Sequence, residues 1–137
     1  MSIEAIGSGI KTRLATITSL RRVYALNELP ESINEFPCAV VMHTGTQYGV
    51  TMGGACDQHD FTVKVFVTNQ DQPSAFNRIL DYLTRTGSDS VVAAIRADTT
   101  LNGSASDVTV MSNAGQGVIT WGGTQYLGTE FTLEVYE

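Results

Sequence analysis

Basic residues, cysteines and long apolar runs are scarce in this sequence, and each shortage excludes a class of protein. Two cysteines among 137 residues are too few for a disulfide scaffold, so a reducing compartment such as the cytosol is expected. Eight Lys and Arg residues against 14 Asp and Glu give a formal net charge of -6, and Arg21 and Arg22 are the only adjacent cations. Because nucleic-acid binding by counterion release needs clustered cations, the chain is not expected to hold DNA or RNA.

The sequence also has no apolar run near the roughly 18 residues of a membrane-spanning helix, so no membrane association is expected. The opening stretch, MSIEAIGSGIKTRL, has no continuous apolar core and carries Glu4 early, which is unlike a signal peptide. Charged residues make up only 16% of the chain. A surface of Thr, Ser, Gly and Asn is easier to desolvate than one of Lys and Glu, so it suits burial against other protein chains.

The spacing of apolar residues predicts one helix at the start of the chain and two in its second half. The first helix has an apolar face formed by Ile3, Ile6, Ile10, Leu14 and Ile17. Gly7 and Gly9 each weaken it by about 1 kcal/mol relative to Ala, so it must depend on packing.

The two later helices have clearer start and stop signals. One begins near Pro73, where the missing N–H has little effect, and ends at Gly87. Its predicted apolar face consists of Phe76, Ile79, Leu80 and Leu83. The other follows N-cap candidates at 88–90. Its predicted apolar face consists of Val91, Val92 and Ile95.

Strands are predicted where β-forming residues gather or alternate with polar ones, at residues 23–26, 38–43, 47–52, 61–68, 108–110, 118–121 and 125–136. In strand 61–68, one face is expected to carry Phe61, Val63, Val65 and Val67, with Phe66 as an exception. In strand 125–136, one face is expected to carry Leu127, Phe131, Leu133 and Val135. NAGQG and WGG are the predicted turns between the last three strands. The order indicates an α+β fold: a mostly antiparallel sheet with helices packed on one face, in a single domain over residues 1–137.

Strands 47–52 and 61–68 are predicted to form a projecting β-hairpin around GGACDQHD. A two-stranded ribbon is only marginally stable alone, so either it lies in the main sheet or a neighbouring chain covers its exposed face. Arg21 and Arg22 form bridges between subunits or are simply solvated. The candidate subunit-interface residues are Tyr48, Val50, Met52, Lys64, Arg21 and Arg22.

Cysteine and histidine provide the clearest candidate chemistry. Cys38, His43, Cys56 and His59 are of the residue types that bind zinc in tetrahedral sites. Only Cys56 and His59 have the close spacing of a zinc motif, and a straight strand points Cys38 and His43 to opposite faces. A Cys–His nucleophile pair would need two of them to meet in space. A buried cysteine and exposed loop residues are the simpler interpretation, so no metal, cofactor or catalytic residue is expected.

The glycine clusters lack the spacing of a dinucleotide-binding fingerprint or a phosphate-binding loop, and they indicate hairpin turns. Trp121 and Tyr126 flank the turn at Gly122 and Gly123. These two aromatic residues either anchor a partner or pair across the strands, and the cross-strand pair is the preferred interpretation.

Three stretches resemble one family of structural proteins. RRVYALNELPESINEFPCAVVMHTG, residues 21–45, is similar to the strand, proline-bearing loop and strand of tail-terminator proteins of long-tailed bacteriophages and their neck-protein relatives. SVVAAIRADTTLNGSASDVTV, residues 90–110, resembles the late helix, the T-L-x-G turn and the next strand of that family. The final GGTQYLGTEFTLEVYE resembles its closing strand, with a Tyr-Leu-Gly step at Tyr126, Leu127 and Gly128.

The resemblance implies a structural virion protein that forms a ring, commonly a hexamer, on the last ring of the tail tube in the neck region. There it would stop tube growth and offer a surface to the head-tail connector, and DNA would pass through the ring without specific binding. Assembly would take place in the host cytoplasm. The family has no catalytic residue or cofactor, so this chain is expected not to be an enzyme.

Two alternatives remain open. The resemblance also extends to other neck, tail-completion or head-closure proteins. The Cys and His residues leave a small cytosolic metal-binding domain or enzyme as a further possibility, which bound zinc and loss of the fold on chelation would favour.

Overall fold

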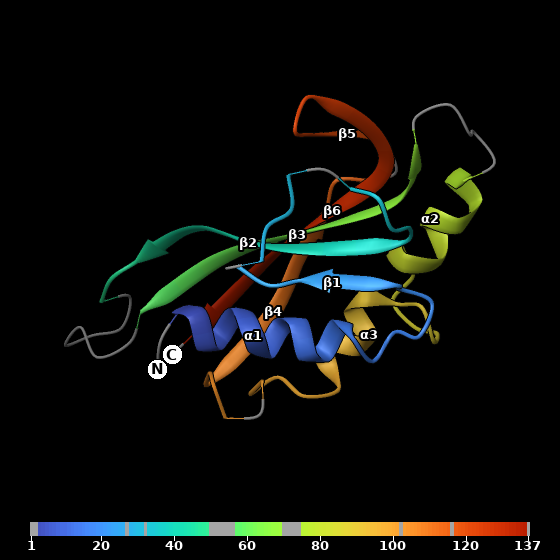
Figure 1. The fold of residues 1–137 in the computed structure, drawn as a ribbon. Coiled ribbons are helices and arrows are strands. Elements are labelled where there is room, and N and C mark those ends of the chain that lie inside the picture. The colour runs from blue at the N-terminus through green and yellow to red at the C-terminus, as the bar shows by residue number, and fades with distance from the viewer. Residues whose placement is uncertain are drawn as a thin grey trace.

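The structure, a computed structural model, describes residues 3–26, 28–31, 33–49, 57–69, 75–101, 103–115 and 117–136. Its elements are α1 (Ile3–Leu14), β1 (Arg22–Tyr24), β2 (Cys38–Gln47), β3 (Gln58–Asn69), α2 (Ala75–Leu83), α3 (Val91–Arg96), β4 (Asp107–Asn113), β5 (Gly117–Trp121) and β6 (Thr124–Tyr136) (Figure 1). The predicted order of a helix, strands, two helices and strands is confirmed.

All of these strands belong to one six-stranded sheet. Its order is β1-β2-β3-β6-β4, and β5 also pairs with β6. β1 runs parallel to β2, and the remaining pairings are antiparallel. The prediction of a mostly antiparallel sheet combined with helices is therefore confirmed.

The last three strands form one long, interrupted hairpin. β4 pairs with residues 131–136 of β6, and β5 pairs with residues 124–128. Because both are antiparallel to β6, they run in the same direction, and the predicted turn at NAGQG is wrong. The chain reverses at Gly122 and Gly123, where φ is 59° and 82°, as a tight hairpin turn requires.

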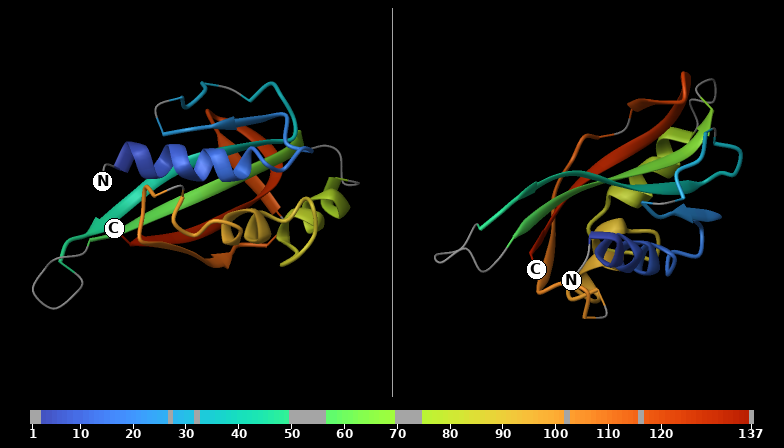
Figure 2. Two further views of the ribbon diagram at one scale, coloured as in Figure 1. Left: turned by 90° about the horizontal axis from the view of Figure 1, so that it is seen from below. Right: turned by 60° about the vertical axis from the view of Figure 1, so that its left-hand side comes forward.

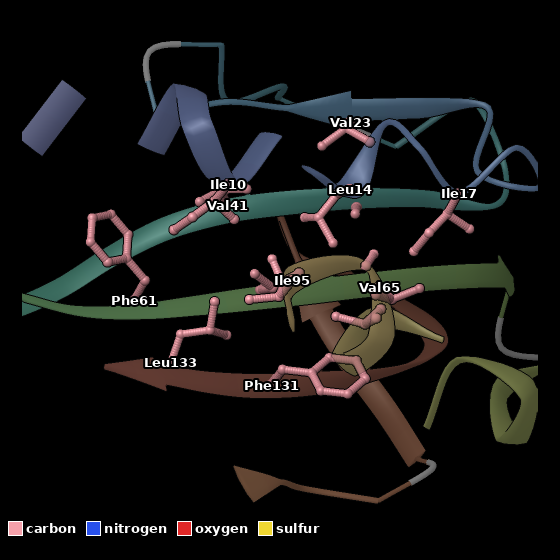
Figure 3. Close-up of a cluster of buried hydrophobic side chains, with 14 of the residues drawn as sticks. Ile10, Leu14, Ile17, Val23, Val41, Phe61, Val65, Ile95, Phe131 and Leu133 are labelled. Carbon is pink, nitrogen blue, oxygen red and sulfur yellow. The ribbon is translucent and has the colours of Figure 1, made fainter. Parts of the chain in front are cut away.

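The larger hydrophobic cluster joins the helices to the sheet. All three helices contribute buried side chains to it: Ile6, Ile10, Leu14, Ile79, Tyr82, Val91, Ala94 and Ile95. Figure 3 shows Ile10, Leu14 and Ile95 among side chains of the strands. The two predicted strand faces are confirmed, and both contribute to this one cluster. Burying each such aliphatic side chain contributes about 1.5–3 kcal/mol.

Phe66, the exception in the β3 pattern, belongs to a second, smaller cluster. Its buried members also include Tyr24, Ile33, Cys38, Val40, Ile119 and Tyr126. The β5–β6 hairpin and the connection from β1 to β2 supply part of this cluster, and both lie above the sheet in Figure 1. The alternation of β3 therefore provides apolar side chains to two cores.

The hairpin arm predicted at 47–52 is placed differently. β2 continues to Gln47 and pairs with β3 from Cys38 onward, so the described part of this arm belongs to the main sheet. Tyr48 and Gly49 form a turn after the strand ends, and residues 50–52 lie outside the described residues.

Both later helices are present, with two corrections. The helix predicted to end at Gly87 ends at Leu83, and its buried face differs from the prediction. Ser90 caps α3, accepting a hydrogen bond from the Ala93 N–H at 3.1 Å. On α2, Leu80 is 46% exposed, whereas Tyr82 is 3% exposed and belongs to the core. Position 80 is rotated by about 100° from Ile79, while position 82 returns toward the buried face. Pro73 and the side chain of Phe76 lie outside the described residues.

The two glycines of α1 allow other segments to approach the helix closely. A Cβ atom at Gly9 would lie 2.8 Å from the Cβ of Leu101, and one at Gly7 would lie 2.6 Å from the Cγ of Leu26. The lost helix propensity is therefore offset by packing against Leu101, which is 1% exposed.

Candidate functional site

Arg22 lies on β1, at the edge of the sheet. Its guanidinium is 3.9 Å from the Glu35 carboxylate and 5.0 Å from the centre of the Tyr24 ring. Half of each charged side chain is exposed, so this ion pair contributes about 0–1 kcal/mol. Arg21 is also exposed, and its backbone N–H donates to the Pro37 carbonyl at 2.8 Å. Both guanidinium groups are accessible to a neighbouring chain.

Lys64, on β3, is more enclosed. Its ammonium is 3.5 Å from the Glu130 carboxylate and 5.7 Å from the centre of the Trp121 ring, and 21% of its side chain is exposed. Across β2 it aligns with Tyr24, two residues from Arg22, so the structure brings both cations to one face of the sheet. The internal partners of Lys64 make it a weaker interface candidate than Arg22.

Tyr48 is separate from these cations. At 79% exposure, it is the most exposed large apolar side chain in the described part of the chain. It follows the last residue of β2, whereas Arg22 pairs with the first, so roughly 30 Å of strand separates them. Val50 and Met52 lie outside the described residues. The described interface candidates therefore form two groups at opposite ends of β2.

The candidate zinc ligands do not all converge. Cys38 belongs to the cluster around Phe66, whereas the His43 ring packs edge-on against Phe61, with centroids 5.3 Å apart. The prediction that the strand points Cys38 and His43 to opposite faces is confirmed. Cys56 lies outside the described residues. Within the ranges that the structure describes, no three His, Cys, Asp or Glu side chains are grouped as a metal site requires.

His43 and His59 do come together, through Thr46. His43 Nε2 and His59 Nδ1 each lie 2.9 Å from Thr46 Oγ1, and the ring centroids are 6.1 Å apart. A hydroxyl has one proton to donate, so one imidazole accepts it while the other donates to the oxygen. The hairpin register explains the contact, since Thr46 is directly opposite His59.

Cys38 has the properties of a core residue. Its side chain is fully buried. Burial, with a smaller contribution from the Glu35 carboxylate, raises the pKa of its thiol to about 12. Because the thiolate is the form that attacks substrates or binds metals, Cys38 is unreactive at neutral pH.

Trp121 and Tyr126 are not directly opposite each other. Tyr126 pairs with Ile119 and Trp121 pairs with Thr124, so the two aromatic residues are diagonal neighbours on the same face, offset by two residues. Both rings instead pack edge-on against Phe66, with centroid distances of 6.0 Å for Trp121 and 5.4 Å for Tyr126. These aromatic residues hold the hairpin over the sheet.

A groove of about 520 Å³ follows β4, the outer strand at one end of the sheet order. Residues of α3 and of the end of α2 form its other wall. Its main apolar lining consists of Leu83, Val92, Val108, Val110, Met111 and Phe131. Arg85, Arg96 and Asp107 contribute charge. An apolar groove with a few charged groups beside a strand edge suits a short protein segment.

The cations of this groove are the residues that sequence reasoning missed. Arg96 is the last residue of α3, and Arg85 lies two residues beyond α2. A basic residue near a helix C-terminus is already explained by its interaction with the helix dipole, so neither position stands out in the sequence. Only the placement of β4 beside α3 reveals that both line one groove.

Among the described residues, no helix is long and apolar enough to span a bilayer. Neither the protein-family models nor the curated proteins gave a match to this chain. The function therefore has to be inferred from the resemblance of the three stretches and from the surfaces described above.

Proposed function

We propose that this chain is a structural protein of a long-tailed bacteriophage virion, a tail terminator whose copies form a hexameric ring on the end of the tail tube. One side of the ring contacts the tube protein, and the other contacts the head-tail connector. DNA passes through the ring without specific binding. The protein acts through its shape, without a catalytic residue or a cofactor.

The observation that carries this proposal is the local fold of the three stretches that resemble the family. Residues 21–45 contain β1, a connection with prolines, and β2. Residues 90–110 contain α3, a turn in which Leu101 has φ 51°, and the start of β4. The closing stretch contains β6. Each stretch thus has the type of element that the family has there, which supports the resemblance.

The proposed assembly uses a particular arrangement of the domain. In it, the helices cover one face of the sheet and the end of the β2–β3 hairpin extends beyond the body. The cluster shared by all three helices supports the first part. In both views of Figure 2, the described ends of β2 and β3 that face each other at Gln47 and Gln58 reach beyond the other strands, which supports the second. The exposure of Tyr48 leaves a large aromatic side chain for contact with a neighbour or with the tube.

The charge of the chain supports passage of DNA without retention. Its formal net charge is -6. Lys11, Arg22 and Lys64 each have a glutamate within ion-pair distance. A channel wall that carries these three paired cations offers no cluster for phosphate groups to bind.

Size-exclusion chromatography with light scattering tests ring formation. The purified chain is expected to elute as one species containing several copies, and a monomer at every concentration contradicts the proposal. Addition to unfinished tail tubes then separates a terminator from another neck component. A terminator stops further addition of tube subunits, whereas another neck component leaves tube growth unchanged.

A further inference from the structure

The two outer strands of the sheet carry different surfaces. β1 and β4 lie at opposite ends of the strand order. Figure 2 (left) shows β1 and the chain that follows it on one side of the molecule, and β4 with α3 on the other. In a closed ring each copy uses one patch to contact a different patch of the next copy. Two unlike edges on one chain meet this requirement.

The β4 side offers the groove beside α3, which contains uncompensated cations. Arg85 and Arg96 line the groove and are both exposed. Over the described ranges, neither guanidinium has a hydrogen-bond or ion-pair partner. Asp107 is the acidic residue of the lining, so two cations face one carboxylate. Met111, 52% exposed, adds an accessible apolar side chain.

The β1 side offers an exposed leucine and a carboxylate on the connection to β2. Glu28 forms an ion pair with α1, and the Pro30 carbonyl accepts a hydrogen bond from Trp121 Nε1 at 2.8 Å. These contacts hold the connection around the edge of the sheet. Leu29, between Glu28 and Pro30, is 45% exposed, and Glu31, directly after Pro30, is also exposed. In the part of the chain that the structure describes, the Glu31 carboxylate has no ion-pair partner.

We infer that Leu29 and Glu31 of one copy dock into the groove between α3 and β4 of the next copy. The Glu31 carboxylate binds Arg85 and Arg96, because guanidinium groups form strong, directional hydrogen bonds with carboxylates. Leu29 packs against the apolar lining. The inference rests on the proposed ring, and it names the contact that builds it.

A second copy of this chain fits the groove because the same chain holds both halves of the contact. The groove is cationic and apolar, and the opposite edge presents a carboxylate beside an apolar side chain. That edge also presents Arg21, while the groove carries Asp107, so charge complementarity exists in both directions. Repetition of one such contact engages both edges of every copy.

Disulfide trapping tests the proximity of the two surfaces. Glu31→Cys and Arg96→Cys are introduced together in a Cys56→Ser background, in which the remaining Cys38 is buried. Mild oxidation is expected to link neighbouring copies into a ladder that extends beyond dimers on a non-reducing gel. Each single-cysteine variant gives dimers at most. A double variant that still forms rings but gives no ladder overturns the inference.

Charge reversal tests the energetics of the contact. Arg96→Glu or Glu31→Arg alone is expected to weaken assembly about tenfold or more, and the two together are expected to restore it. Arg78→Glu is the matched control, because Arg78 is an exposed cation of α2 that does not line the groove. Single variants that assemble like the wild type overturn the inference and leave the ring proposal intact. A wild-type chain that stays monomeric overturns both.

Discussion

Gly128 of β6 lies directly against the backbone of Val65 on β3. A Cβ atom at position 128 would be 1.9 Å from the Val65 carbonyl oxygen, far inside contact distance. The pairing of β3 with β6 shifts register immediately beyond this point. Gly128 also ends the Tyr-Leu-Gly step of the resemblance. A local backbone contact is therefore the physical reason for a glycine at that position.

Gly128→Ala is predicted to destabilise the fold by about 1–3 kcal/mol, because β3 or β6 must shift to admit the methyl group. Urea unfolding monitored by circular dichroism measures the change. Gly45→Ala is the control: it also replaces a strand glycine, but its Cβ would meet nothing closer than an Asp60 oxygen at 4.0 Å. Equal stability of the two variants would contradict the close contact at Gly128.

Thr129 fixes the interruption between β4 and β5. Its Oγ1 accepts a hydrogen bond from Asn113 Nδ2 at 2.7 Å and donates one to the Gly115 carbonyl at 2.9 Å. Thr129→Val keeps the shape but leaves these polar groups without their partner, so a loss of about 1–3 kcal/mol in unfolding free energy is predicted. Thr132→Val, at an exposed position of β6, should change it by less than about 0.5 kcal/mol. If Thr129→Val left the unfolding free energy unchanged, the hydrogen bonds from Thr129 to Asn113 and Gly115 would not stabilise the fold.

Cys38 should make the fold sensitive to alkaline pH. Burial raises the pKa of its thiol from 9.0 to about 12. The folded state therefore favours the neutral thiol, and the resulting stability is complete below pH 9 and is lost as pH rises toward 12. Between pH 9 and 11 the wild type is predicted to lose on the order of 2–3 kcal/mol more than Cys38→Ala. Parallel pH profiles of the two proteins in urea unfolding would contradict this.

Tyr48 is predicted to act in assembly rather than in folding. Because its side chain is 79% exposed, Tyr48→Ser should leave the unfolding free energy within about 0.5 kcal/mol of the wild type. Assembly measured by light scattering should weaken about tenfold, as expected when a large aromatic contact is removed. Leu80→Ser is the control, since Leu80 is 46% exposed on α2. If Tyr48→Ser assembled as strongly as the wild type, Tyr48 would not belong to the interface.

Removal of divalent metals is predicted to leave the fold unchanged. Cys38 lies on the other face of the sheet from His43, so the described residues provide two imidazoles but no complete tetrahedral set. Thermal unfolding with and without EDTA, together with metal analysis of the purified protein, measures this. Bound zinc that Cys56→Ser removes, with a lower melting temperature after chelation, would favour the metal-binding alternative.

The sequence predicts the core elements well because each depends on a local period. The alternation from Phe61 to Val67 and the three- and four-residue steps from Ile6 to Leu14 are both confirmed in the larger cluster. The predictions fail where two neighbouring residues are both apolar enough to be buried. Leu80 and Tyr82 are both apolar enough for the core of α2, and only tertiary packing buries Tyr82.

The candidate site was less predictable because it depends on contacts between distant segments. NAGQG has the composition of a turn, yet its neighbours pair with successive parts of β6 and keep one direction. The groove requires that β4 lie beside α3, and no local pattern gives that relation. The cluster of Trp121, Tyr126 and Phe66 likewise depends on how the last hairpin lies over the sheet.

Negative-stain electron microscopy of the purified chain tests the central claim most directly. The account predicts closed rings with a central opening and a constant number of copies. Arg78→Glu should leave these rings intact, and Arg96→Glu should disperse them. Uniform particles of single-chain size at every concentration tested would contradict it.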